Sequence, residues 1–439
     1  MVPRRPQQAR SVATVERAVA ATVELVDELG APEVRFAQVA ERSGVSNGSL
    51  LHHFGSLDSL LSTAEAVRYE RAVSARMATA RRAVLASGDV AALRAVVDRT
   101  AEAVASGAFD ELRWTRLGAL SFARHRPELR ELLAGTIRSL RAQLADLLGD
   151  LRENGMLAYD VPAGAVTAFL HAHTVGRLVE DVVDDRLPPE QWVALLGVAV
   201  RGGFGIAEGT FAPAVGVADA DDVVALLPEV DGLLLDHGVD RFDDADEQRV
   251  FEAARARFVE QGEQSIVVAD LLRETQVSNG WFVRRFHGRD ELVDLLYLDA
   301  YLRMRDLETA ALVEAFTSAG TAADVVHRLV GRFLGLEEHA AWERWWDRID
   351  LLIAASARPA LRTVVAPLVA EQLAVITDAV EDGQARGVVR DDLAAAAIAR
   401  FLWGIPVAIV VAALGGIATA ELRTFSVALC SALVRDPEA

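Results

Sequence analysis

One short segment occurs twice in this chain, and the distance between its two copies recurs along most of the sequence. Val45-Ser46-Asn47-Gly48 returns as Val277-Ser278-Asn279-Gly280, so the residue numbers differ by a constant offset (277 − 45 = 232). The same offset relates further pairs: Arg17 and Arg249, Phe54 and Phe286, Trp114 and Trp346, Arg126 and Arg358, Gly155 and Gly387, and Phe169 and Phe401. Since one offset with few gaps is hard to obtain by chance, we interpret the chain as a duplicated unit.

The repeat divides the 439 residues into two units joined by a linker. The first unit runs from about residue 12 to 207 and the second from about 244 to 439, and the aspartate-, glycine- and proline-containing segment between them is typical of a linker. We predict five parts: an N-terminal arm and first head (1–60), a first helical ligand and dimerisation domain (61–207), the acidic linker (208–243), a second, degenerate head (244–292) and a second helical domain (293–439).

The composition and the spacing of apolar residues predict an all-α protein. Aromatic residues make up only 6% of a chain dominated by alanine, leucine, valine and arginine, which favours helices over sheets. In the first unit Val15, Val19 and Val26 recur at helical spacing, which predicts a helix over 12–29 that Gly30 is placed to end in a left-handed conformation.

Two short helices follow, joined by a turn. Gly44 permits a tight turn because glycine enters positive φ at little cost, and Ser46 can cap the next helix, 47–54. Ser56 and Asp58 are placed to begin a fourth helix. This arrangement predicts a helix-turn-helix, whose second helix can enter the major groove of DNA.

The run FAQVAERSGVSNGSLLHHFGSLDSLL (36–61) resembles the signature of the tetracycline-repressor-like (TetR) family, in which a small residue, a Gly-Val-Ser turn, a helix ending in Phe and an acid-x-Leu helix start follow in fixed order. The segment RPELRELLAGTIRSLRAQLADLLGDLRENGML also resembles the family. The resemblance covers both units. It implies two three-helix heads, each with a bundle of about six helices, and dimerisation through the last two helices, at 163–184 and 190–207 and at 395–414 and 419–435.

The sequence departs from the family pattern at several positions. Leu51 and Val283 stand where the family usually has tyrosine, and Leu57 stands where a lysine is expected to meet a phosphate. The second head has Leu272 at the small position and Gln276 at the turn glycine. A glutamine held at positive φ costs about 1 kcal/mol unless the turn is remodelled. The second head is therefore the more degenerate one.

The charge distribution indicates sequence-specific rather than general DNA binding. The formal charge of −19 argues against a protein that coats nucleic acid. The arm before the first head is basic, whereas the arm before the second is acidic; Arg284 and Arg285 replace His52 and His53, and arginine reads guanine bidentately. We predict these DNA contacts: Arg4, Arg5, Arg10, Arg35, Ser46, Asn47, Ser49, Leu50, His52, His53, Ser278, Asn279, Trp281, Arg284, Arg285 and Arg289. Alternatively, the second head's arginines pair with the acidic linker and are structural.

The resemblance also implies a pocket for a mostly apolar small-molecule effector. The candidates are Trp114, Phe122, Phe169, His171, His173, Trp342, Trp345, Trp346, Phe401 and Trp403. Aromatic residues at helical spacing also fit a plain hydrophobic core. His171 and His173 are two residues apart, about 200° around a helix, so one metal ion does not readily bind both. No phosphate loop, nucleophile elbow or zinc-protease motif occurs, so we predict no metal, no cofactor and no enzyme.

The uncharged stretch 401–420 meets the length criterion for a membrane span. It contains Gly404 and Pro406, and its counterpart in the first unit includes His171 and Arg177, so we predict a buried helix. With one cysteine and no signal-peptide pattern, the expected location is the cytoplasm.

These features favour a ligand-released repressor. Its two units would form an intramolecular pseudo-dimer on an asymmetric or pseudo-palindromic operator. Two alternatives stay open: a ligand-binding or protein-interaction module that has lost DNA binding in one or both heads, and an enzyme that uses a bundle cavity. The second would require a converged acid/base pair, which the sequence does not show.

Overall fold

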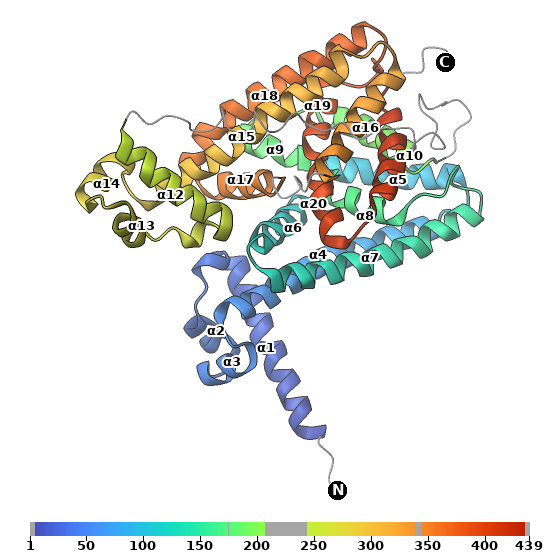
Figure 1. Cartoon of the computed structure of the whole chain (residues 1–439). Coiled ribbons are helices and arrows are strands. Elements are labelled where there is room, and N and C mark those ends of the chain that lie inside the picture. Colours follow the sequence, from blue (N-terminus) through green and yellow to red (C-terminus); the bar gives the residue numbers. More distant parts are fainter. Residues whose placement is uncertain (1–4, 174, 207–243, 339–344, 435–439) are drawn as a thin grey trace.

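The computed structural model describes residues 5–173, 175–206, 244–338 and 345–434, and every regular element in these ranges is a helix (Figure 1). Two isolated β-bridges, Leu157–Ile206 and Val389–Val434, are the exceptions to the helical pattern. The all-α prediction is confirmed. The predicted linker, 208–243, lies outside the described residues.

The helices of the second half follow the order of those of the first, and most are of similar length. The first half comprises α1 (Arg5–Leu29), η1 (Ala31–Glu33), α2 (Phe36–Ser43), α3 (Asn47–Phe54), α4 (Leu57–Leu85), α5 (Val90–Ala105), α6 (Asp110–Ala123), α7 (Pro127–Glu153), α8 (Ala163–Ala172), α9 (Val175–Val183) and α10 (Pro189–Gly203). The second comprises α12 (Ala245–Gln261), η3 (Glu263–Ser265), α13 (Val268–Thr275), α14 (Asn279–Phe286), α15 (Arg289–Thr317), α16 (Ala322–Glu338), α17 (Trp345–Ala357), α18 (Pro359–Ala385), α19 (Ala395–Gly404), α20 (Val407–Gly415) and α21 (Thr419–Ser431). The starts of α13, α14 and α15 are related to those of α2, α3 and α4 by the offset found in the sequence (268 − 36, 279 − 47 and 289 − 57).

Local signals in the sequence set the turns of both heads. Gly44 ends α2 at φ 65°, and the Ser46 hydroxyl accepts a hydrogen bond from the Ser49 amide at 3.3 Å. In the second head Gln276 takes φ 58°, so of the two alternatives the turn keeps its left-handed residue and is not remodelled. Gly30 has positive φ (81°) but ψ 147°, so the predicted left-handed cap is wrong at this position.

Of the two helices predicted at the end of each unit, the first is in fact two helices, whereas the second is continuous. The predicted helix over 395–414 ends at Gly404 and restarts at Val407, because Pro406 has no N–H to donate within a continuous helix. The predicted helix over 163–184 is interrupted at the corresponding place, between α8 and α9.

Three hydrophobic cores organise the described residues. The first head has a core of its own around Val39 and Leu50, and the second head has one around Phe282 and Phe286. The remaining helices of both halves share one continuous core. The two heads therefore sit on a single helical body (Figure 1).

Helices of the two halves pack on each other in reciprocal pairs. Helix α8 packs on α20 and α9 on α19; α8 packs on α21 and α10 on α19; α7 packs on α20 and α18 on α9. The equivalent helices α10 and α21 contact one another, as do α6 and α17. A two-fold interface produces this kind of reciprocity.

Small residues and ion pairs bring the halves into close contact. Gly176 of α9 lies directly against the backbone carbonyl of Arg400 in α19. Arg124 pairs with Asp347 at 2.6 Å and with Asp350 at 2.7 Å. All three side chains are at least four-fifths buried, so this ion cluster is shielded from solvent.

Two segments are long and apolar enough to cross a membrane by length and composition, Pro359–Ala385 and Ala395–Gly415. The more apolar window, in Ala395–Gly415, is 78% buried inside the protein, as expected for a core helix. These segments therefore do not indicate a membrane location.

Candidate nucleic-acid interface

Helix α3 of the first head presents a polar face to solvent. Asn47 and His52 are exposed, while Ser49 and His53 are half-buried. Leu50, by contrast, is fully buried in the head core, so its prediction as a DNA contact is wrong. Helix α3 packs on the head core through Leu50, so the exposed side chains of Asn47 and His52 are accessible to a partner.

The other predicted contacts of the first head have local structural roles or lie at the start of the chain. Ser46 is exposed and caps α3. Arg35 is exposed at the N-cap of α2, and its guanidinium donates to the Val34 carbonyl at 2.9 Å. Arg5 and Arg10 belong to the first turns of α1, which extends beyond α2 and α3 in Figure 1, so the predicted arm is helical from residue 5. Arg4 lies outside the described residues.

Helix α14 of the second head exposes Asn279 and Arg284. Within the described part of the chain, no hydrogen bond or ion pair holds the Arg284 side chain. Ser278 caps the helix by accepting from the Trp281 amide at 3.2 Å. The half-buried Trp281 ring lies 6.2 Å from that of Phe286. Arg284 is therefore available to a partner, whereas Trp281 mainly completes the head core.

Two further arginines of this head are held by the protein itself. Arg285 forms an ion pair with Glu247 of α12, whose side chain is 7% exposed. Arg289 donates to the backbone carbonyls of Ile266 at 3.0 Å and Glu263 at 2.9 Å. This geometry favours the structural alternative for Arg285 and Arg289. The sequence analysis had not paired these residues individually.

An arginine at the start of a long helix joins each head to the body. Arg126 pairs with Asp58 at the start of α4 (2.7 Å), and its guanidinium lies 3.5 Å from the centre of the Phe122 ring. Arg126 also donates to Gln264 of the second head at 2.8 Å. Arg358 forms an ion pair with Glu263 of the second head and also pairs with Asp294 of α15 at 2.9 Å. The position of each head is thus tied to the body.

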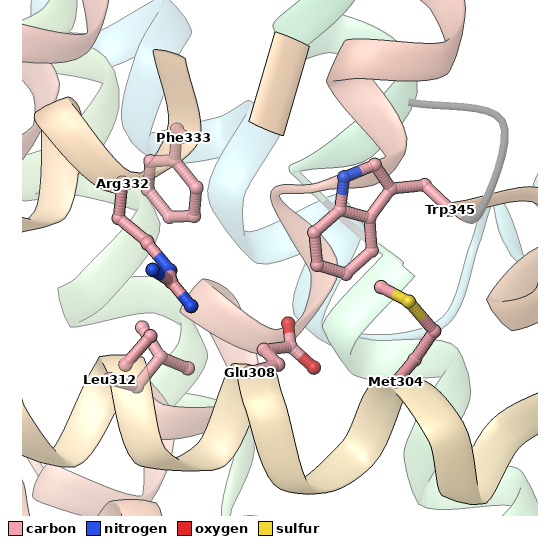
Figure 2. Close-up of a pocket in the computed structure, with 7 residues that line it drawn as sticks. Met304, Glu308, Leu312, Arg332, Phe333 and Trp345 are labelled. Atoms are coloured by element: carbon pink, nitrogen blue, oxygen red, sulfur yellow. The ribbon is translucent and has the colours of Figure 1, made fainter. Parts of the chain in front are cut away.

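The predicted pocket residues are mostly ordinary core residues. Those that are buried are Phe169, His171, His173, Trp345, Trp346, Phe401 and Trp403, whereas Trp114 and Phe122 are half-buried. Trp342 lies outside the described residues. Of the predicted set, Trp345 lines the cavity in Figure 2, together with Met304, Glu308, Ala311, Leu312, Arg332 and Phe333. The sequence analysis missed the other six.

His171 is fixed as a neutral hydrogen-bonding group. A carbonyl oxygen can only accept a hydrogen bond, so the His171 Nδ1 carries the proton and donates to the Thr167 carbonyl at 2.7 Å. The Nε2 of the neutral ring then accepts a hydrogen bond from the Tyr69 hydroxyl at 2.6 Å. Burial, reinforced by the nearby Arg116 charge, lowers the pKa of His171 to about 3. Within the described residues, no group of three or more His, Cys, Asp or Glu side chains is placed to hold a metal ion.

The lowered pKa predicts a loss of stability in acid. The unfolded chain takes up a proton on His171 below its ordinary pKa of 6.5, whereas the folded protein does so only near about 3. Between these values the free energy of unfolding should fall by about 1.4 kcal/mol per pH unit through this group. Urea unfolding at pH 7.5 and 5.5 should show a weaker pH dependence for His171→Gln. His52→Gln, an exposed control, should match the parent; equal pH dependence in all three proteins would contradict the prediction.

The first head has the geometry of a DNA-binding helix-turn-helix: a glycine turn, a capped second helix and an exposed polar face on that helix. Residues 18–64 match the family described as bacterial regulatory proteins, tetR family. The first head therefore carries the N-terminal domain of that family.

Similar proteins include transcriptional regulators. The HTH-type transcriptional regulator BetI of Ectopseudomonas mendocina (strain ymp) is 34% identical over 122 residues, 26% of this chain and 57% of the relative. The regulator of the same name from Burkholderia mallei (strain NCTC 10229) is 33% identical over 124 residues, 28% of this chain and 62% of the relative. The match thus spans less than two thirds of these relatives. They are regulators rather than enzymes, in agreement with the prediction of a non-enzymatic protein.

Proposed function

We propose that this chain is a DNA-binding transcriptional regulator whose two tetR-like units form a pseudo-dimer within one molecule. The observation that carries the proposal is the presence of two helix-turn-helix heads on one body built by reciprocal packing of the two halves. A two-headed particle of this kind suits two neighbouring half-sites on DNA.

The second unit is inferred from its helices. Helices α13 to α15 keep the displacement found in the sequence, and the starts of α7 and α18 differ by the same amount (359 − 127 = 232). A serine cap begins α14 as it begins α3. These similarities support five parts with the boundaries given above, although α4 and α15 run continuously across the boundaries at residues 60 and 292.

In the proposed pseudo-dimer, the two units of one chain take the place of the two subunits of an ordinary dimer. The linker keeps the second unit at high effective concentration near the first. Since the exposed residues of α3 and α14 differ, with His52 on one and Arg284 on the other, the operator is expected to be asymmetric or only pseudo-palindromic.

The proposed regulation is release from DNA by a mostly apolar effector that binds the helical body. Such a ligand changes head spacing only if it binds one arrangement of the body more tightly than the other. Arg126 and Arg358 connect the starts of α7 and α18 to α4 and α15, so a shift of the long helices reaches the heads. A regulator of this kind acts in the cytoplasm.

A second candidate is a ligand-binding or interaction module whose second head no longer reads DNA. The observation that favours it is the engagement of Arg285 and Arg289 by groups of the same head.

Fluorescence anisotropy tests the proposed function. The purified full chain is titrated onto its own upstream promoter DNA and onto a scrambled duplex, across a series of salt concentrations. We expect selective binding to the promoter with a moderate salt slope, because a few phosphates are neutralised at two heads. Equal affinity for the scrambled duplex would contradict a sequence-specific regulator and favour the second candidate.

A further inference from the structure

A narrow cavity in the second half is lined by a buried carboxylate that has an oxygen without a hydrogen-bond partner among the described residues. It lies between α15, α16 and α17, and its apolar walls are Met304, Leu312 and Phe333. The space between atoms is about 320 Å³, including the part open to solvent, and as it stands it admits little more than one water-sized group. A larger ligand therefore enters only if a side chain of the cavity wall moves.

Glu308 contributes a carboxylate of which the described residues satisfy one oxygen. Its Oε2 accepts from Arg348, which forms a close ion pair with it, and from Gln372 at 3.2 Å. Its Oε1 is buried and has no hydrogen-bond partner among the described residues, and the Glu308 side chain is only 6% exposed. An unpaired buried carboxylate oxygen is costly, so Oε1 needs a hydrogen-bond donor that no described residue supplies.

Arg332 faces the same space from α16. Figure 2 shows the Arg332 guanidinium pointing toward the Glu308 side chain, whose carboxylate lies on the side of Trp345 and Met304. No ion pair joins Arg332 to Glu308 within the described residues. A group that contacts both side chains has to accept from Arg332 and donate to Glu308. A hydroxyl does both and is small enough for the gap.

We propose that this cavity binds a neutral, apolar molecule through one hydroxyl group, as in a phenol or a hydrophobic alcohol. The hydroxyl donates to Glu308 Oε1 and accepts from Arg332. The apolar body lies against Leu312 and Phe333, after rotation of the unbranched Met304 side chain, which adapts readily to new shapes. This inference rests on the proposed function, because it names the chemical class of the effector.

The site belongs to the second half alone. The position equivalent to Trp345 in the first half is Arg113 (345 − 232). The Arg113 side chain is 2% exposed, forms an ion pair with Asp110 and donates to the Val104 carbonyl at 3.3 Å. A charged side chain held in this way occupies the place of the indole wall. One ligand per chain is therefore expected.

Calorimetric titration of the full chain without DNA tests the proposal with 4-ethylphenol as the probe and 4-ethylanisole as its matched control. We expect one 4-ethylphenol per chain and at least about tenfold weaker binding of the anisole, which cannot donate to Glu308. Arg332→Met should weaken 4-ethylphenol binding by about tenfold, whereas Arg328→Met, one turn away on α16, should leave it unchanged.

Leu312→Trp fills the cavity and should abolish binding, with circular dichroism confirming that the chain stays folded. No binding of 4-ethylphenol, equal binding of both probes, or two sites per chain would overturn the proposal. Since no DNA is present, selective phenol binding by a chain that fails the promoter titration would remove the proposed regulator and leave the ligand site.

Discussion

Gly176→Val should separate the two halves of the molecule. A Cβ at position 176 would overlap the carbonyl of Arg400, and neither backbone can move aside without displacing its helix. Overpacking against backbone in a buried helix contact costs about 3 kcal/mol or more. We therefore expect a markedly lower unfolding temperature and loss of the contact between α9 and α19.

A protease site inserted within 208–243 makes this separation visible. After cleavage, the parent halves should elute together in size-exclusion chromatography with light scattering, whereas the Gly176→Val halves should elute apart or aggregate. Gly149→Val is the matched control, since position 149 is exposed on α7 and a Cβ there meets nothing within 4 Å. Cleaved Gly176→Val halves that stay together with an unchanged unfolding temperature would contradict the proposed pseudo-dimer interface.

The heads were predictable from sequence because their structure is determined locally. Gly44 and Ser46 specify a turn and a cap within a few residues, and the helix observed over Asn47–Phe54 has the predicted bounds. Which face of that helix meets the core depends on the packing of α2 and α4 against it. Leu50 was misassigned as a DNA contact for this reason.

The cavity could not be predicted in the same way. Glu308 and Arg348 lie far apart in the sequence and form an ion pair only when α15 meets α17. In sequence each is one charged residue within a helix. The repeat did contain a signal, since Arg116 and Arg348 are related by its offset (348 − 116 = 232) and both are buried. An arginine at the equivalent position of α6 and of α17 therefore indicates a buried charged site inside the helical body.

Aromatic residues were a poor guide to a pocket because they also fill cores efficiently. Phe169 contacts Phe401 and Phe425 across the two halves, with ring centres 6.2 and 5.3 Å away. These rings belong to the packing between the halves. Their burial argues that the aromatic sets chosen from sequence mainly stabilise the body.

Arg284→Ala should weaken binding to the operator by about 5- to 150-fold, which corresponds to the loss of about 1–3 kcal/mol for a bidentate contact to guanine. Arg284 is exposed on α14 and is not held by a described side chain, so it is the arginine of this helix best placed to reach a base. Anisotropy titrations against operators altered one base pair at a time should show that the variant tolerates replacement of one guanine.

Arg285→Ala, at the adjacent position, is the matched comparison. Its guanidinium already pairs with Glu247, so its removal should change DNA affinity less and instead lower the free energy of unfolding by about 1–3 kcal/mol, because a buried carboxylate loses its partner. The two variants therefore distinguish an arginine that contacts DNA from an arginine that stabilises the head. Unchanged DNA affinity in Arg284→Ala, together with a large loss of affinity in Arg285→Ala, would make Arg285 the residue that contacts DNA. Unchanged affinity in both variants would mean that the second head does not bind DNA.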